Sequence, residues 1–145
     1  MRIMGLDIGT KRIGIAISDP LCYTAQGKMV MERRGVEADI QTIKDLVAAE
    51  KVSALVAGLP KNMDGTIGEG AERVLSFVRA LEGALSMAVI LWDERWTTVE
   101  ATRVLLEADM TRRKRRKVVD KVAAVLILQG YLDSLDQHVE KGAQP

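Results

Sequence analysis

Three carboxylates stand at points in the chain where their side chains could meet. Asp7 lies within the apolar stretch MRIMGLDIGT, Glu94 lies at the end of another apolar stretch, just after Asp93, and Asp120 begins a helical pattern. A carboxylate buried in a strand loses its hydration, and this cost must be compensated. Three neighbouring carboxylates also repel each other. A hard divalent cation that prefers oxygen ligands, Mg²⁺ or Mn²⁺, would compensate both effects.

A site of this kind can cut a phosphodiester bond. A pair of such ions ~3.5–4 Å apart can activate a water molecule and stabilise the leaving oxygen. We therefore expect Asp7, Glu94 and Asp120 to be catalytic residues that bind one or two Mg²⁺ or Mn²⁺ ions.

Each acid also has a simpler interpretation when taken alone. Asp7 precedes Gly-Thr and could form a turn. Glu94 lies between Asp93 and Arg95 and could belong to a surface ion pair. Asp120, in a first helical turn, would interact favourably with the helix dipole. The convergence of all three on one edge of a sheet is what favours the metal site.

The composition excludes several other chemistries. The only histidine is His138, so neither a Ser–His–Asp triad nor a histidine-ligated zinc site can form. No GxxxxGK[ST] loop is present, which excludes a P-loop NTPase. Cys22 is the only cysteine, so no internal disulfide forms. We expect a cytoplasmic protein with no leader and no membrane contact.

The apolar pattern predicts an α/β fold. Strands at Arg2–Ile8, Arg12–Ser18 and about 24–31 have short links and form an antiparallel meander. The pattern then alternates between helical and strand periods, which implies parallel strands. The further predicted elements are a helix over the stretch VEADIQTIKDLVAAE (36–50), a strand at 53–59, a helix at 69–84, a strand at 87–92, a helix at about 97–108 and a helix at about 119–135.

The expected architecture is a mixed five-stranded sheet, three antiparallel strands plus two parallel ones, flanked by helices. We expect one domain over residues 1–138 and a flexible C-terminal tail over 139–145. Ligands in such sheets bind at the carboxyl ends of the parallel strands. Asp7 and Glu94 lie at those ends, and Asp120 shares a helix face with an apolar stripe that starts with alanines. That stripe contains Ala123, Ala124, Ile127, Leu128 and Tyr131.

Basic residues surround the predicted acidic site. The run RRKRRK immediately precedes Asp120 in a chain of net charge +1, and a solvated linker is its simpler interpretation. Arginine and lysine contacts to phosphate are the main source of nucleic-acid affinity. With 3% aromatic residues, recognition of a structured duplex is favoured over base stacking. The predicted nucleic-acid-binding residues are Lys11, Arg12, Lys61, Arg95, Arg112, Arg113, Lys114, Arg115, Arg116 and Lys117.

Four motifs carry a resemblance to a known family. They are LDIGTKRIGIAISD, GLPKNMDGT, DERWTT and RRKRRKVVDKVAAVLILQGYLD. In these motifs the chain resembles the YqgF (RuvX) family of RNase H-fold nucleases over nearly its whole length. Trp96 stands where that family more often carries a smaller aliphatic residue.

The resemblance implies an RNase H-like fold in a cytoplasmic bacterial protein, with Asp7, Glu94 and Asp120 as the acidic catalytic set. It also implies a function in processing the 5′ end of the pre-16S ribosomal RNA, during ribosome biogenesis. The alternative that it implies is a Holliday junction resolvase acting on branched DNA.

The leading hypothesis is therefore a nuclease, dependent on Mg²⁺ or Mn²⁺, that acts on structured RNA and contacts the ribosomal precursor. Two hypotheses of other classes stay open. DIGTKRIG looks like the phosphate-binding hairpin of actin-like and sugar-kinase ATPases, which would make the chain a nucleotide phosphotransferase. A non-catalytic nucleic-acid-binding factor is the other.

Overall fold

The computed structural model describes residues 1–96 and 112–143, and the side chains of residues 1–96 and 118–135. Its elements follow the predicted order. They are β1 (Arg2–Ile8), β2 (Arg12–Ser18), β3 (Ala25–Glu32), α1 (Val36–Ala49), β4 (Val52–Leu59), α2 (Glu69–Leu85), β5 (Val89–Asp93), the short 3-10 helix η1 (Glu94–Trp96) and α4 (Arg112–Ala143).

The five strands form one mixed sheet in the order β3-β2-β1-β4-β5. The pairs β1–β2 and β2–β3 are antiparallel, whereas β1–β4 and β4–β5 are parallel. The predicted fold class is confirmed. Because β1, β4 and β5 run in the same direction, their carboxyl ends share one edge of the sheet.

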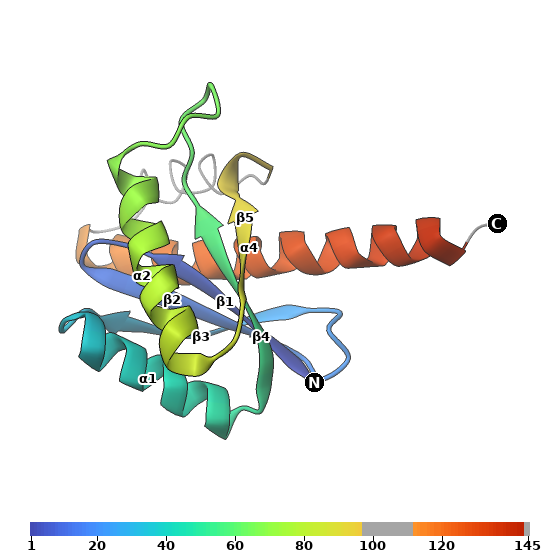
Figure 1. Ribbon diagram of the computed structural model, residues 1–145, viewed down its shortest axis with the longest axis horizontal. Coiled ribbons are helices and arrows are strands. Elements are labelled where there is room, and N and C mark those ends of the chain that lie inside the picture. The colour runs from blue at the N-terminus through green and yellow to red at the C-terminus, as the bar shows by residue number, and fades with distance from the viewer. Residues whose placement is uncertain (97–111, 144–145) are drawn as a thin grey trace.

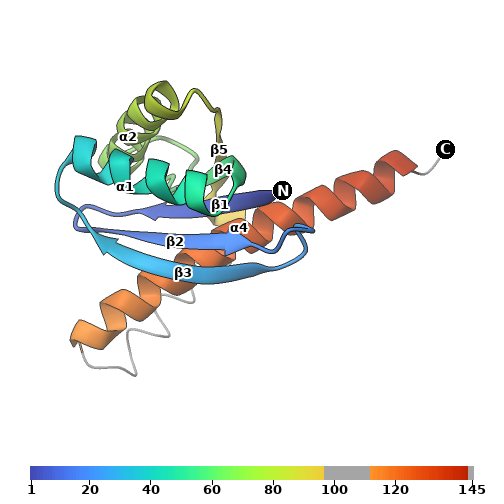
Figure 2. The same ribbon diagram turned by 90° about the horizontal axis from the view of Figure 1, so that it is seen from below.

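Helices cover both faces of this sheet. Helices α1 and α2 lie on one face and α4 crosses the other, as Figures 1 and 2 show. Alternation along β1 serves both sides: Met4 and Leu6 belong to the core beneath α1 and α2, and Ile3 belongs to the core beneath α4. The second core also contains Val56 of β4 and Leu128 of α4.

Helix α4 packs very closely on the sheet because glycines face it. A Cβ added to Gly5 of β1 would lie 2.7 Å from the Leu128 Cβ, and one added to Gly14 of β2 would collide with the carbonyl oxygen of Asp120. Ala123 and Ala124 are fully buried at the same contact. The predicted helix stripe is confirmed, and its small residues allow the helix backbone to reach the strands.

The last helix is longer than predicted at both ends. It begins at Arg112 rather than at about 119, so the basic run is helical and does not separate two helices. Arginine and lysine are good helix formers, and charge alone does not end a helix. The helix continues to Ala143 through the segment predicted as a tail, and its end extends past the sheet (Figure 1). The helix predicted at 97–108 lies outside the described residues.

The remaining boundaries agree with the predictions within two residues, β5 starting at Val89 rather than at 87. Within the described part of the chain, no helix combines the length and apolarity needed to cross a bilayer.

Replacing Gly14 with alanine tests the contact between α4 and the sheet. We expect Gly14→Ala to lower the free energy of unfolding by about 3 kcal/mol, since the new methyl group meets backbone that cannot rotate away. Denaturant unfolding is the measurement. The matched control is Gly83→Ala in α2, where a Cβ meets nothing within 4 Å and should stabilise the helix by roughly 0.5–1 kcal/mol. Equal stabilities of Gly14→Ala and wild type would contradict the close packing.

Candidate active site

Asp7 occupies the centre of a row of residues that crosses the sheet near its carboxyl edge. It pairs directly with Gly14 of β2. On its other side, the parallel register Leu6↔Ala57 brings Gly58 of β4 next to it. The row faces α4, since both Gly5 and Gly14 contact that helix. Asp7 is 7% exposed, so its carboxylate lies buried beneath α4.

Glu94 reaches this row from the end of β5. Its Oε1 lies 2.7 Å from the point where a Cβ of Gly58 would be, and Ile127 of α4 lies beside it. Neighbouring strands are about 4.8 Å apart, so the Glu94 carboxylate rests one strand away from Asp7. Glu94 is only 5% exposed, so it does not lie at the surface, as the interpretation as a surface ion pair requires.

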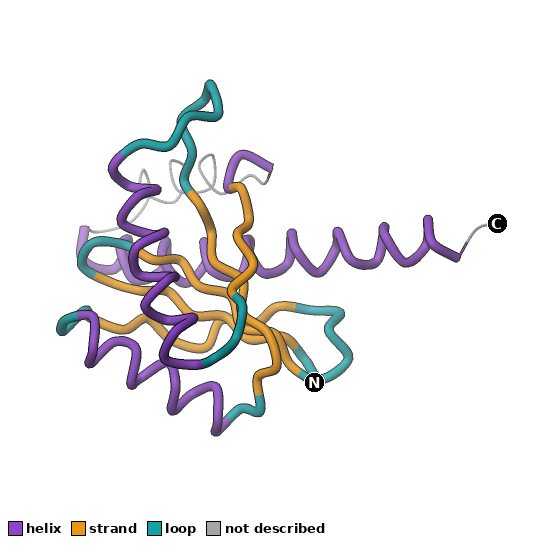
Figure 3. Tube along the Cα trace, viewed as in Figure 1, coloured by secondary structure: helices purple, strands orange, loops and turns teal. Residues whose placement is uncertain are grey.

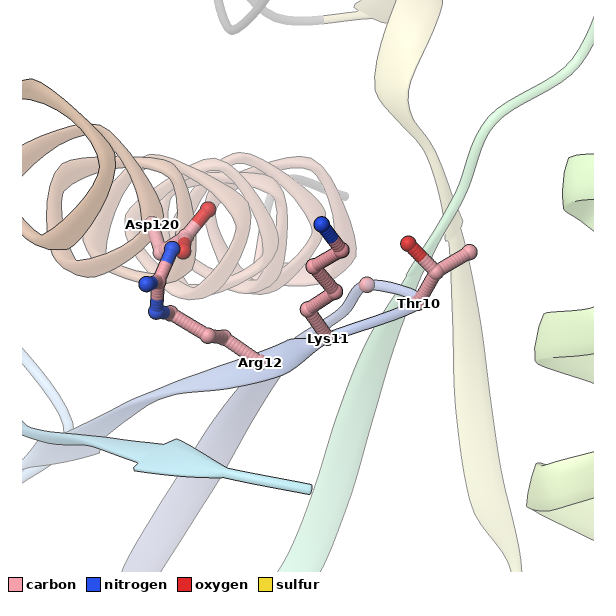
Figure 4. Close-up of a pocket in the computed structure, with 5 residues that line it drawn as sticks. Thr10, Lys11, Arg12 and Asp120 are labelled. Carbon is pink, nitrogen blue, oxygen red and sulfur yellow. The ribbon is translucent and has the colours of Figure 1, made fainter. Parts of the chain in front are cut away.

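Asp120 reaches the same row from above. Its carbonyl oxygen lies over Gly14, the β2 neighbour of Asp7. The Asp120 side chain is half-buried and lines an open pocket of about 300 Å³ with the β1–β2 turn, Gly9 to Arg12 (Figure 4). Helix α4 starts eight residues earlier, at Arg112, so the explanation of Asp120 as a first-turn residue is wrong.

The three acids are not equally close to one another. Asp7 and Glu94 occupy adjacent positions under the helix, and the Asp120 side chain lies at the rim. Among the described residues, no three His, Cys, Asp or Glu side chains are grouped closely enough to hold a metal ion. Mg²⁺ is commonly held by only one or two carboxylates, with waters and substrate phosphates as its other ligands. The chemistry of the Asp7–Glu94 pair fits that ion.

Two of the predicted cations lie at the mouth of this site. Lys11 and Arg12 extend from the start of β2 on the side where α4 passes, and both line the pocket with Asp120 (Figure 4). Arg12 also forms an ion pair with Glu32 of β3, with 3.0 Å between its Nε and Oε1. The side chains of residues 112–117 lie outside the described ones.

Two more of the predicted nucleic-acid-binding residues, Lys61 and Arg95, flank the buried Asp93. Arg95 binds both carboxylate oxygens of Asp93, at 2.6 Å through its Nη2, and the Lys61 Nζ lies 3.9 Å away. These hydrogen bonds from Arg95 hold the pKa of Asp93 below its usual value, and Asp93 raises the pKa of Arg95. Arg95 also donates to the Met63 carbonyl in the loop 60–68, which extends from the body in Figure 3.

Another buried acid, which the sequence analysis missed, holds the β1–β2 turn through Arg33. Asp39 of α1 is 1% exposed and accepts a hydrogen bond from the Arg33 Nε at 3.1 Å. Arg33 in turn donates its Nη1 to the Gly9 carbonyl and its backbone N–H to the Lys11 carbonyl. The guanidinium lies 4.9 Å from the Phe77 ring centre. One signal was available: Asp39 occupies the apolar stripe of its helix, three residues after Val36 and four before Ile43.

Comparison with known proteins places this arrangement in a family. The family model described as RuvX, Holliday junction resolvase, matches residues 1–134. The chain belongs to the RuvX family. A relative from Moorella thermoacetica is 56% identical over 138 residues, which are 95% of this chain and 99% of the relative. One from Clostridium botulinum strain Hall is 54% identical over 137 residues, 94% of this chain and all of the relative. Both carry the name "Putative pre-16S rRNA nuclease".

Solved structures with low sequence identity share the fold of this RuvX chain. Thermus thermophilus RuvC in complex with a Holliday junction substrate superposes with a TM-score of 0.58 at 12% identity, covering 92% of this chain and 96% of that one. The fowlpox virus Holliday junction resolvase gives 0.52 at 14% identity, covering 92% and 99%. The predicted RNase H-like fold is confirmed.

Removing the Asp39 carboxylate tests whether the Asp39–Arg33 pair stabilises the β1–β2 turn of this RuvX-family chain. We expect Asp39→Ala to lower the free energy of unfolding by about 3 kcal/mol, because a buried charge pair loses one partner. Urea unfolding followed by circular dichroism is the measurement. Asp45→Ala on the exposed side of the same helix is the control and should change stability by less than about 0.5 kcal/mol. Equal effects of the two substitutions would contradict the assigned role of Asp39.

Proposed function

We propose that the chain is a divalent-metal-dependent nuclease that hydrolyses phosphodiester bonds at the Asp7–Glu94 pair. The observation that carries this proposal is the position of Glu94, whose Oε1 occupies the space above Gly58, one strand from Asp7. Both carboxylates are buried, and two neighbouring carboxylates repel each other, a repulsion that a bound divalent cation would offset. Membership of the RuvX family supports the same activity.

Asp7 and Glu94 would hold Mg²⁺ or Mn²⁺, and Asp120 would complete the site by turning its side chain inward from the rim. The bound ion, or pair of ions, would lower the pKa of a coordinated water and neutralise charge on the phosphate. The protein's own contribution is to fix the two carboxylates. Gly58 leaves room for Glu94, and α4 shields the pair from bulk water.

Phosphate binding would begin at the basic rim. Lys11 and Arg12 line the pocket beside Asp120, and six further basic residues, 112–117, form the first turns of α4. Arginine and lysine beside a phosphate release its counterions and supply affinity that does not depend on base sequence. Lys61 and Arg95 would act one step further out, since both already contact Asp93.

The substrate that we propose is the pre-16S ribosomal RNA, cut at its 5′ end in the cytoplasm during ribosome biogenesis. The names of the relatives from Moorella thermoacetica and Clostridium botulinum support it. The second candidate is a four-way DNA junction. The description of the family model and the fold shared with RuvC favour that candidate.

The test is a cleavage assay with Mn²⁺ on a pre-16S RNA fragment and a four-way DNA junction in parallel. We expect Asp7→Asn to slow cleavage of the preferred substrate by about a hundredfold or more, since even partners of metal ligands are worth 10–100-fold. Circular dichroism should show an unchanged fold, and Asp45→Asn on α1 is the matched control. Cleavage by Asp7→Asn at the wild-type rate would overturn the catalytic assignment.

A second variant tests the position of the Glu94 carboxylate above Gly58 without removing a charge. In Gly58→Ala, the new methyl group would lie 2.7 Å from the Glu94 Oε1 and 2.5 Å from the Ile127 Cδ1. We expect the displaced carboxylate to raise the Mn²⁺ concentration needed for half-maximal cleavage by roughly tenfold. Gly83→Ala, in open space on α2, is the control. The same Mn²⁺ dependence in both variants would show that Glu94 does not bind the ion from this position.

A further inference from the structure

Aromatic side chains gather beside the acidic site, although the chain has few of them. Of its two Trp, two Tyr and one Phe, three lie together next to β5. Trp92 contacts Trp96 edge to face, with 5.0 Å between ring centres, and contacts Tyr131 of α4 at 6.3 Å. Trp92 and Tyr131 belong to the core beneath α4, so the cluster lies on the same face of the sheet as Asp7.

Trp96 is the outer member of this cluster and is 65% exposed. Its ring packs edge to face on Trp92, a contact that favours one orientation of the ring. It belongs to the same 3-10 helix as Glu94, two residues further along. Arg95, between them, is fastened to Asp93. The exposed ring is therefore held at a set position beside the Asp7–Glu94 pair.

We propose that Trp96 stacks on an unpaired nucleobase next to the phosphate that is cut. The inference rests on the proposed nuclease function and narrows its substrate class. A phosphate at the Asp7–Glu94 pair would bring the base of an adjoining nucleotide near Trp96, which belongs to the same 3-10 helix as Glu94. A base inside a continuous duplex offers only its edges, so stacking requires a base that is splayed out or single-stranded.

This inference changes the expectation drawn from composition. The low aromatic content favoured recognition of a structured duplex, but a single well-placed ring is enough to stack one base. Base–aromatic stacking tolerates any base because every base has a π face. The substrate is then a strand that is unpaired at the cleavage point, whether at an RNA end or at a DNA branch point.

The chain offers a fluorescent reporter for this contact. The Trp92 Nε1 is buried and has no hydrogen-bond partner among the described residues, so Trp92→Phe removes no hydrogen bond there. The variant leaves Trp96 as the only tryptophan. In EDTA, we expect a single-stranded RNA 12-mer to quench its emission and a blunt duplex of the same sequence to quench it little. Absence of quenching by the single strand would overturn the proposal.

Affinity supplies the second arm of the experiment. We expect Trp96→Ala to weaken single-strand binding by roughly tenfold, measured by anisotropy of labelled RNA, and Trp96→Phe to restore most of it. The matched control is Tyr23→Ala, which removes a ring of similar exposure, 61%, at the opposite edge of the sheet. Equal losses in Trp96→Ala and Tyr23→Ala would overturn the stacking role.

The two proposals fail in different ways. Both arms measure binding without metal, so they do not depend on cleavage. A wild-type protein that cuts RNA or DNA while Trp96 shows neither quenching nor an affinity effect would retain the nuclease function and refute the stacking. Quenching in a protein that cuts neither substrate would retain the stacking and refute the nuclease function.

Discussion

The contact between α4 and the glycine-bearing face of the sheet determines where the acids lie. Gly5 and Gly14 let the helix backbone touch β1 and β2, and any side chain there would hold the helix off. The same contact buries Asp7 of β1, which pairs with Gly14 of β2, and carries Asp120 to the rim. A carboxylate in this position is tolerated only if something compensates its lost hydration. The same contact between helix and sheet therefore closes the core and positions the acids of the site.

Gly58 extends this arrangement to the third strand. It leaves a gap on the face of β4 that the Glu94 carboxylate fills, so the two buried acids become neighbours across one strand spacing. Asp93, the residue before Glu94, accepts hydrogen bonds from Arg95. Asp93 is therefore a structural acid, whereas Glu94 is the catalytic candidate. Adjacent acidic residues in the sequence therefore have different tasks, which follow from the opposite faces that they present.

Much of the fold could be predicted because its signals are local. Alternation located β1 and β2 to the residue, and the stripe from Ala123 to Leu128 identified the buried face of α4. The start of α4 was predicted too late because the basic run Arg112–Lys117 was interpreted as a separator between two helices. The run carries no helix-breaking residue, and it is helical. The position of the Glu94 carboxylate depends on the space that Gly58 leaves, 36 positions earlier in the chain, and no spacing rule links the two residues. The pairing of Asp39 with Arg33 likewise depends on the packing of α1 beside the β1–β2 turn, which the sequence pattern does not specify.

The most direct test of the account locates a bound cation without any nucleic acid. Substoichiometric Mn²⁺ added to isotopically labelled protein should broaden the amide NMR signals of Gly14 and Gly58, the two neighbours of Asp7. It should spare the loop Asp19–Thr24 at the opposite edge, and Asp7→Asn should abolish the broadening. Broadening centred elsewhere, or unchanged by Asp7→Asn, would contradict a metal site built on Asp7 and Glu94.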